Sequence, residues 1–166
     1  MEKEKTMLTG WLQVLKEPDR SELVSMSLVA TASSLRVDRV LIWLFDGEVL
    51  QFFGEPSLLG IAPTAIAPGQ GAIGTCFKKG QMIVFDRPFT ESWASAALSC
   101  DANDAKEPVT GYLAPLRLAG LPVGVLAALR AGEERIHPTD MVGAEVHCLK
   151  LALALHHCAI SGEICS

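Results

Sequence analysis

Residues 39–53, RVLIWLFDGEVLQFF, decide the fold of this chain. Arg39–Phe45 is short, β-branched and aromatic, which predicts a buried strand. Asp46-Gly47 follows, and an Asp-Gly pair between two apolar runs is a strong hairpin signal, because both central residues of the tight turn need positive φ. Val49–Phe53 is then the returning strand, so the segment predicts an antiparallel hairpin.

The residues before the hairpin predict helix. Residues 8–16 form a short amphipathic segment, and Pro18 ends it or marks a break, because proline cannot continue a helix interior. Ser21 can cap a second helix that has acidic residues in its first turn. An apolar stripe from Leu23 to Leu35 carries this helix towards the hairpin.

The residues after the hairpin predict an α+β fold. We expect a Gly- and Pro-rich loop (residues 54–70), a short helix (71–79), a strand (Met82–Phe85) and a long polar loop (86–109). A second hairpin (Gly111–Leu118 with Val123–Leu129) and a closing helix (Pro138 to about Ile160) follow. The second hairpin turns through Ala119-Gly120-Leu121-Pro122. No full crossover helix joins two strands, which favours an antiparallel sheet with helices on one face.

The composition is that of one globular domain. The chain has 166 residues, a net charge of −5, 49% hydrophobic residues and 20% charged residues. Its Lys and Arg residues are scattered, which disfavours direct nucleic-acid binding, and no apolar run reaches the ~18 residues that span a bilayer. The N-terminus lacks the apolar core of a signal peptide. These features predict a cytoplasmic protein whose five cysteines are free thiols.

Four segments in register resemble the GAF family. They are the hairpin RVLIWLFDGEVLQFFG, Ile66–Asp86 (IAPGQGAIGTCFKKGQMIVFD), Tyr112–Leu129 (YLAPLRLAGLPVGVLAAL) and Ile136–Asp140 (IHPTD). The resemblance covers residues 22–160. It implies a GAF-like, PAS-related central antiparallel sheet of about six strands, with the N- and C-terminal helices on one face. Small ligands would then lie on the other face, under the loop 86–109.

This resemblance divides the chain into an N-terminal helical extension (1–20), a GAF domain (21–162) and a tail (163–166). It implies a sensory or regulatory domain that binds a small ligand, dimerises, or does both, to control an attached effector. That effector would be a kinase, a phosphohydrolase, a cyclase or a transcription activator. A ligand-free dimerisation module is an alternative. The identity of any ligand or cofactor stays open.

The sequence from Gly69 to Gly74 matches G-x-G-x-x-G, the pattern of a dinucleotide phosphate loop. Pro68 precedes it instead of a strand, and Gly80 leaves no room for a crossover helix, so the strand–helix context is missing. We interpret these glycines as a tight entry into a short helix that lies close to the sheet.

Cys100, in the long loop, offers an enzymatic alternative. It lies where free methionine-R-sulfoxide reductases of the GAF class carry a Cys-Asp pair, and Cys76 is a candidate second thiol. That class has a cysteine within its Gly-rich motif where this chain has Ile73. A thioether link to a bilin would need histidine after the cysteine, where this chain has Asp101. An unreactive loop thiol is the favoured interpretation, and no Ser-His-acid arrangement accompanies it.

Position and chemistry together select a set of candidate residues for a ligand pocket, because small-ligand sites combine apolar walls with few polar groups. They are Phe85, Asp86, Trp93, Cys100, Asp101, Tyr112 and Ala114.

The closing helix is apolar on two sides, and one side is expected to face a second copy. The predicted dimer-interface residues are Cys148, Leu151, Leu155 and Cys158. The alternative is that both terminal helices pack only within one chain. No metal site is predicted, because the His and Cys residues of this helix lack i, i+4 spacing.

Overall fold

The computed structural model describes residues 18–53, 63–84, 109–132 and 150–154. Its elements are α2 (Pro18–Leu35), β1 (Arg39–Phe45), β2 (Leu50–Phe53), β3 (Ala65–Ile66), α3 (Gly71–Lys79), β4 (Ile83–Val84), β5 (Val109–Leu118) and β6 (Leu121–Ala131). Residues 150–154 are also helical. The strands pair antiparallel in the order β3-β2-β1-β6-β5-β4. The α+β fold with six strands is therefore confirmed.

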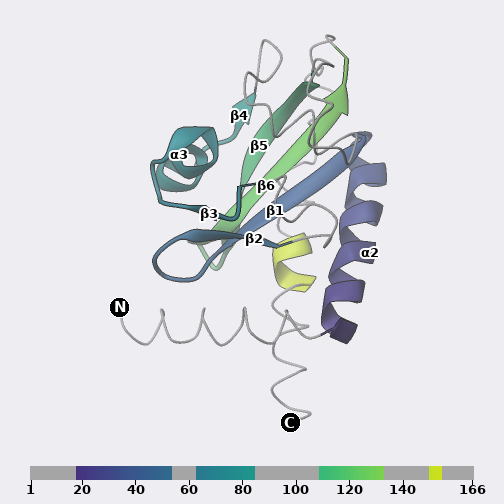
Figure 1. Ribbon diagram of the computed structural model, residues 1–166, viewed down its shortest axis with the longest axis horizontal. Coiled ribbons are helices and arrows are strands. Elements are labelled where there is room, and N and C mark those ends of the chain that lie inside the picture. The colour runs from purple at the N-terminus through teal and green to yellow at the C-terminus, as the bar shows by residue number, and fades with distance from the viewer. Residues whose placement is uncertain (1–17, 54–62, 85–108, 133–149, 155–166) are drawn as a thin grey trace.

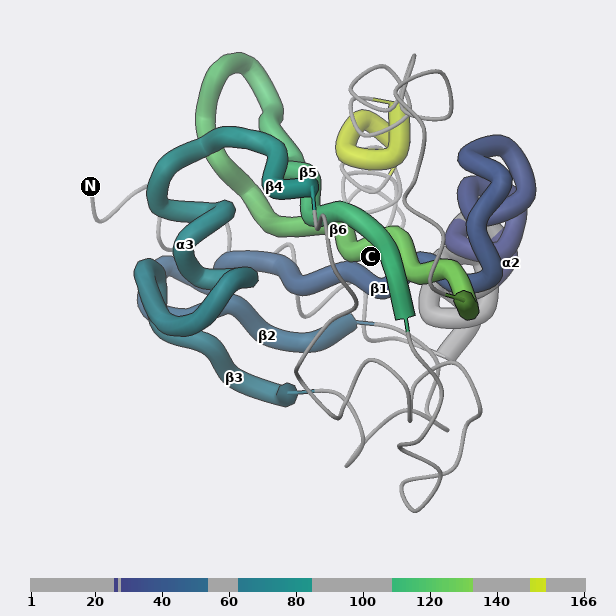
Figure 2. The backbone as a smooth tube through the Cα atoms, turned by 90° about the horizontal axis from the view of Figure 1, so that it is seen from above, coloured from purple at the N-terminus to yellow at the C-terminus, as the bar shows by residue number. Residues whose placement is uncertain are grey.

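The helices lie on both faces of the sheet. α2 and the segment 150–154 lie on one side of the strands, and α3 lies on the other (Figure 1, Figure 2). Each face has its own apolar core. On the α2 side the core contains Leu28, Ala32, Leu35, Ile42, Tyr112, Leu126 and Leu151, among others. On the α3 side it contains Leu41, Trp43, Phe52, Ile73, Phe77, Leu113 and Val125, among others.

The predicted β1–β2 hairpin is confirmed, but its turn differs from the expected one. Phe45 pairs with Leu50, so the connection is longer than a two-residue turn. Gly47 has a φ of 104°, whereas Asp46 does not have positive φ. The Asp46 carboxylate instead accepts hydrogen bonds from the backbone N–H groups of Glu48 (2.8 Å) and Val49 (2.9 Å). A side chain that bonds its own turn thus replaces the tight two-residue turn.

The tight turn occurs in the β5–β6 hairpin instead. Ala119 and Gly120 both have positive φ (51° and 80°), and Leu118 pairs with Leu121 across them. The connection is therefore shorter than the predicted one, which extended to Pro122. Pro122 lies within β6 opposite Arg117, next to a register shift. Proline has no N–H to donate to the strand ladder, which explains the irregularity there.

The backbone explains where α2 begins and where it ends. It begins at Pro18, before Ser21, so Ser21 is not the cap that we expected. Proline suits the first helical turn, where its missing N–H would have no helical partner. At the other end the N–H of Arg36, with φ of 56°, donates to Ser33 O (3.2 Å), and the N–H of Val37 donates to an α2 carbonyl (3.1 Å). This left-handed cap turns the chain sharply towards β1.

Candidate functional site

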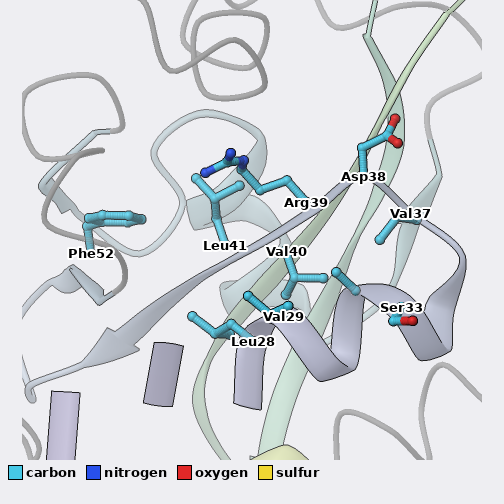
Figure 3. Close-up of a pocket in the computed structure, with 10 residues that line it drawn as sticks. Leu28, Val29, Ser33, Val37, Asp38, Arg39, Val40, Leu41 and Phe52 are labelled. Carbon is cyan, nitrogen blue, oxygen red and sulfur yellow. The ribbon is translucent and has the colours of Figure 1, made fainter. Parts of the chain in front are cut away.

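A pocket of about 290 Å³ lies at the joint between α2 and β1, and we call it the joint pocket (Figure 3). One wall comes from the last turns of α2, namely Leu28, Val29, Ala32 and Ser33. Leu28 and Ala32 are buried against the sheet, whereas Val29 and Ser33 are exposed. The left-handed cap of α2 places this wall beside the first residues of β1.

The remaining lining comes from the link and from the first half of β1. Val37 and Val40 lie on the α2 side, and Arg39 and Leu41 leave β1 on the opposite side (Figure 3). Phe52 of β2 closes that opposite side. Both faces of the sheet therefore contribute, and the pocket reaches around the edge of β1. Among the described residues, β2 pairs only with residues 42–45 of β1.

Hydrogen bonds tie this joint to the end of β6. The Asp38 carboxylate accepts a hydrogen bond from the Ala131 N–H (2.8 Å), and the Asp38 N–H donates to Leu129 O (2.9 Å). The Arg130 guanidinium donates to the Arg36 carbonyl (2.8 Å). The position of the joint pocket is thus set by backbone contacts as well as by packing.

The structure settles the position of only two of the seven predicted ligand residues. Phe85, Asp86, Trp93, Cys100 and Asp101 lie outside the described residues. Tyr112 and Ala114 are buried in the core on the α2 side. They therefore do not face the α3 side, where we expected the ligand. Side chains alternate along β5, so their neighbour Leu113 takes that side instead.

The predicted dimer interface is described at one position. Cys148, Leu155 and Cys158 lie outside the described residues. Leu151 is 3% exposed and packs in the core of its own chain, so it is not the surface residue that we expected. Leu153, two residues further along this helix, is 49% exposed. At this turn the exposed apolar side chain is therefore Leu153 and not the predicted Leu151.

On the α3 side the sheet is covered by apolar packing at the described residues. The Trp43 ring lies 5.7 Å from the Phe52 ring, and its Nε1–H donates to Pro63 O (2.8 Å). The Phe45 and Phe77 rings lie 4.7 Å apart. α3 therefore sits tightly on the sheet through side chains of both.

The Gly-rich entry into α3 has a structural role, as we expected. A Cβ on Gly74 would lie 2.4 Å from Ala67 O, so the helix approaches the preceding chain too closely for any side chain. The Gly69 N–H donates to Gly74 O (2.8 Å), and the Gln70 side chain accepts from the Ala67 N–H (3.0 Å). These bonds hold the chain closely against the first turn of α3, which is the tight entry that the glycines allow.

Cys76 is a buried thiol in α3. Its Sγ–H donates to Gln81 O (3.3 Å), and the side chain is fully buried. Burial raises the pKa of the Cys76 thiol from 9.0 to about 12, and the nearby Arg117 guanidinium opposes only part of that rise. A thiol is a weak nucleophile and the thiolate is the reactive form. Cys76 is therefore poorly suited to act as a second redox thiol.

This pKa predicts a loss of stability at high pH. The unfolded chain ionises Cys76 above about pH 9 while the folded protein keeps it protonated to about pH 12. The stability that the protonated Cys76 thiol contributes is complete below pH 9. As the pH rises above 9, the free energy of unfolding falls by up to about 1.4 kcal/mol per pH unit. In urea titrations across this range, the stability of the parent relative to Cys76→Ala should decline. A constant difference between the two proteins would contradict the assignment.

Sequence reasoning did not find the joint pocket. Its walls come from a helix end, a link and two strands, and only the capped turn at Arg36 brings them together. One signal was available in the sequence: Val37-Asp38-Arg39 places two opposite charges directly between an apolar helix and an apolar strand.

No helix in the described part of the chain is long and apolar enough to cross a membrane. The GAF domain model matches residues 19–155. No curated protein matches the sequence.

The fold is similar to several solved structures. The GAF domain of a phosphoenolpyruvate-protein phosphotransferase from Coxiella burnetii superposes with a TM-score of 0.64 at 15% identity, over 97% of this chain and 95% of that one. A putative GAF sensor protein from Burkholderia vietnamiensis gives 0.57 at 24% identity, over 90% and 86%. A free methionine-R-sulfoxide reductase from Neisseria meningitidis, in complex with its substrate, gives 0.60 at 18% identity, over 92% and 86%. By the family match over most of its length, this chain belongs to the GAF domain family.

Proposed function

We propose that this chain is a non-catalytic regulatory domain, in which two copies pair through their terminal helices and a small molecule adjusts that pairing to control an attached effector. The effector would be a kinase, a phosphohydrolase, a cyclase or a transcription activator. The similar structures include a chemotaxis-protein segment and a putative GAF sensor protein, at 16% and 24% identity, which accord with a regulatory role and support a shared fold. The location that accords with this role is cytoplasmic.

The observation that carries the proposal is the apolar outer surface of the terminal helices. α2 buries Leu28 and Ala32 against the sheet, yet Met26 and Val29 are 64% and 61% exposed. Leu153 adds a further exposed apolar side chain on the helical segment 150–154, which lies on the same side of the sheet as α2 (Figure 2). Helices that are apolar on two sides are usually buried on both, which favours a partner against Met26 and Val29 of α2.

Replacing Met26 by glutamate is expected to weaken this pairing. A charge placed in an apolar interface loses its water without gaining a partner, which should raise the dimer dissociation constant about tenfold or more. Analytical ultracentrifugation over a micromolar concentration series measures that constant. Leu121→Glu is the matched control, because Leu121 is 50% exposed at the tip of the β5–β6 hairpin. A monomeric parent protein would rule out the dimer.

A reductase activity through Cys100 is the alternative function. Two similar structures are free methionine-R-sulfoxide reductases, at 18% and 14% identity, and these identities support a shared fold alone. The state of Cys76 disfavours the alternative. An assay of free methionine sulfoxide reduction by the parent and by Cys100→Ser decides it, and turnover that disappears in the variant would make the chain an enzyme. Phe85, Asp86, Trp93, Cys100 and Asp101 remain proposed ligand residues.

A further inference from the structure

We infer that two copies of this chain pair through the exposed side of α2 in an antiparallel arrangement, so that the beginning of one helix lies beside the end of the other. The inference rests on the proposed function and specifies the surface and the orientation that the proposed function leaves open. The surface, which we call the α2 outer face, consists of five exposed residues: Met26, Val29, Ala30, Ser33 and Ser34.

The α2 outer face carries no charge. No Asp, Glu, Lys, Arg or His occurs anywhere from Leu23 to Leu35, and α2 lies at the outside of the described elements (Figure 1, Figure 2). A surface helix usually carries charged or polar residues opposite its buried side. Here Met26 and Val29 are 64% and 61% exposed on that side. A surface of this kind suits a second helix better than it suits water.

The sizes of the side chains favour an antiparallel pair. Met26 and Val29 make the first half of the α2 outer face bulky, and Ala30, Ser33 and Ser34 make the second half small. If two helices run antiparallel about a two-fold axis near Val29 and Ala30, Met26 of each copy meets Ser33 of the other. Bulky residues then pack on small ones at both ends, as close packing requires. A parallel pair sets Met26 against Met26 and leaves space at the two serines.

The charges at the two ends of α2 favour the same orientation. Asp19 and Glu22 occur in its first turns with one arginine, Arg20, between them, and the exposed Arg36 directly follows its last residue. Glu22 and Arg36 both lie two helical turns from Val29, on the same row of the helix. An antiparallel pair therefore brings Glu22 of each copy near Arg36 of the other. A parallel pair brings like charges together, which is unfavourable.

The orientation decides what pairing does to attached effectors. α2 extends from Pro18 to Leu35, which is about 27 Å at the rise of an α-helix. In an antiparallel pair the first residues of the two helices lie about that far apart. Pairing would then hold apart two effectors that precede α2, whereas a parallel pair would bring them side by side.

Cysteine cross-linking of the full chain tests the orientation. A disulfide needs Cα atoms within about 7 Å of each other, so a mixture of Met26→Cys and Ser33→Cys proteins should form a mixed, disulfide-linked dimer. Neither variant alone should cross-link efficiently, because the same residue in two antiparallel copies lies about 10 Å apart along the helix axis. Peptide mass spectrometry assigns each disulfide to the introduced cysteines. Stronger linking of Met26→Cys to itself than to Ser33→Cys would overturn the inference.

Val29→Cys distinguishes a failure of this inference from a failure of the proposed function. Val29 lies near the proposed axis, so Val29→Cys should cross-link to itself in either orientation. Leu121→Cys, at the exposed tip of the β5–β6 hairpin, is the control and should not cross-link. A dimer in ultracentrifugation that forms no link at Val29 overturns the inference alone. A parent protein that stays monomeric overturns the proposed function and the inference together.

Charge reversal tests the contact between the two ends of α2. Arg36→Glu and Glu22→Arg should each raise the dimer dissociation constant about threefold or more, because each variant places like charges together at both ends of the pair. The double variant restores opposite charges and should return the constant close to that of the parent. Ultracentrifugation at low ionic strength measures these constants, and thermal unfolding establishes that each variant is folded. A double variant that pairs more weakly than either single variant would overturn the antiparallel orientation.

Discussion

Replacing Trp43 by alanine is expected to destabilise the domain by about 3–5 kcal/mol, the cost of removing a large aromatic side chain from a core. Trp43 is fully buried on the α3 side, packs against the Phe52 ring and donates a hydrogen bond to Pro63 O. Its removal leaves a cavity and takes away the Nε1–H donor to Pro63 O. For a chain of this length the melting temperature should fall by about 6–20 °C.

Two variants show whether the effect is specific to Trp43. Trp43→Phe keeps an aromatic ring beside Phe52 and loses the Nε1 donor to Pro63, so its effect should be clearly smaller. Leu121→Ala removes an exposed side chain and should change stability by no more than about 0.5 kcal/mol. Calorimetry or urea unfolding measures all three. A Trp43→Ala protein as stable as the parent would contradict the packing on the α3 side.

Gly124→Ala is expected to destabilise the sheet by about 3 kcal/mol, at the upper end for overpacking. β6 is a central strand that pairs with β1 and β5, and Gly124 lies opposite Leu44. A Cβ at this position would lie 2.3 Å from the backbone O of Trp43. Because that atom belongs to the neighbouring strand and not to a flexible side chain, β1 and β6 must move apart to accommodate it.

Gly120→Ala is the matched control for this prediction. Gly120 has φ of 80°, and a Cβ there would meet no described atom within 4 Å, so alanine at this position introduces conformational strain without a clash. That strain costs about 1 kcal/mol. Urea unfolding should therefore rank Gly124→Ala as the more harmful variant, and the opposite order would show that contact between the strands is not the reason for glycine at position 124.

Much of the sheet could be predicted from the sequence because its strands carry local signals. The apolar runs of β1, β2, β5 and β6 are long enough to identify, although β5 and β6 extend beyond the predicted ends. β3 was missed, since Ala65–Ile66 is short and is a strand only through its pairing with Leu50 and Gln51. Pairing of that kind depends on tertiary contact and leaves no periodic pattern in the sequence.

The candidate site was harder to predict for a different reason. The hydrophobic pattern places Tyr112 within a strand, but the facing of its side chain depends on the register with β6, where it pairs with Ala128. A shift by one residue reverses the face of every side chain. The joint pocket depends further on a left-handed backbone at Arg36, a residue type that rarely adopts it, so no composition signal marks the turn.

The hydrogen bonds between the end of α2 and the end of β6 couple these two elements. Two hydrogen bonds, from Arg130 to the Arg36 carbonyl and from the Ala131 N–H to Asp38, hold together points that are almost a hundred residues apart along the chain. Strand ends ordinarily fray, yet this one is anchored to the exit of a helix. A displacement of the end of α2 would therefore pull on the end of β6 at the point where the chain leaves the sheet.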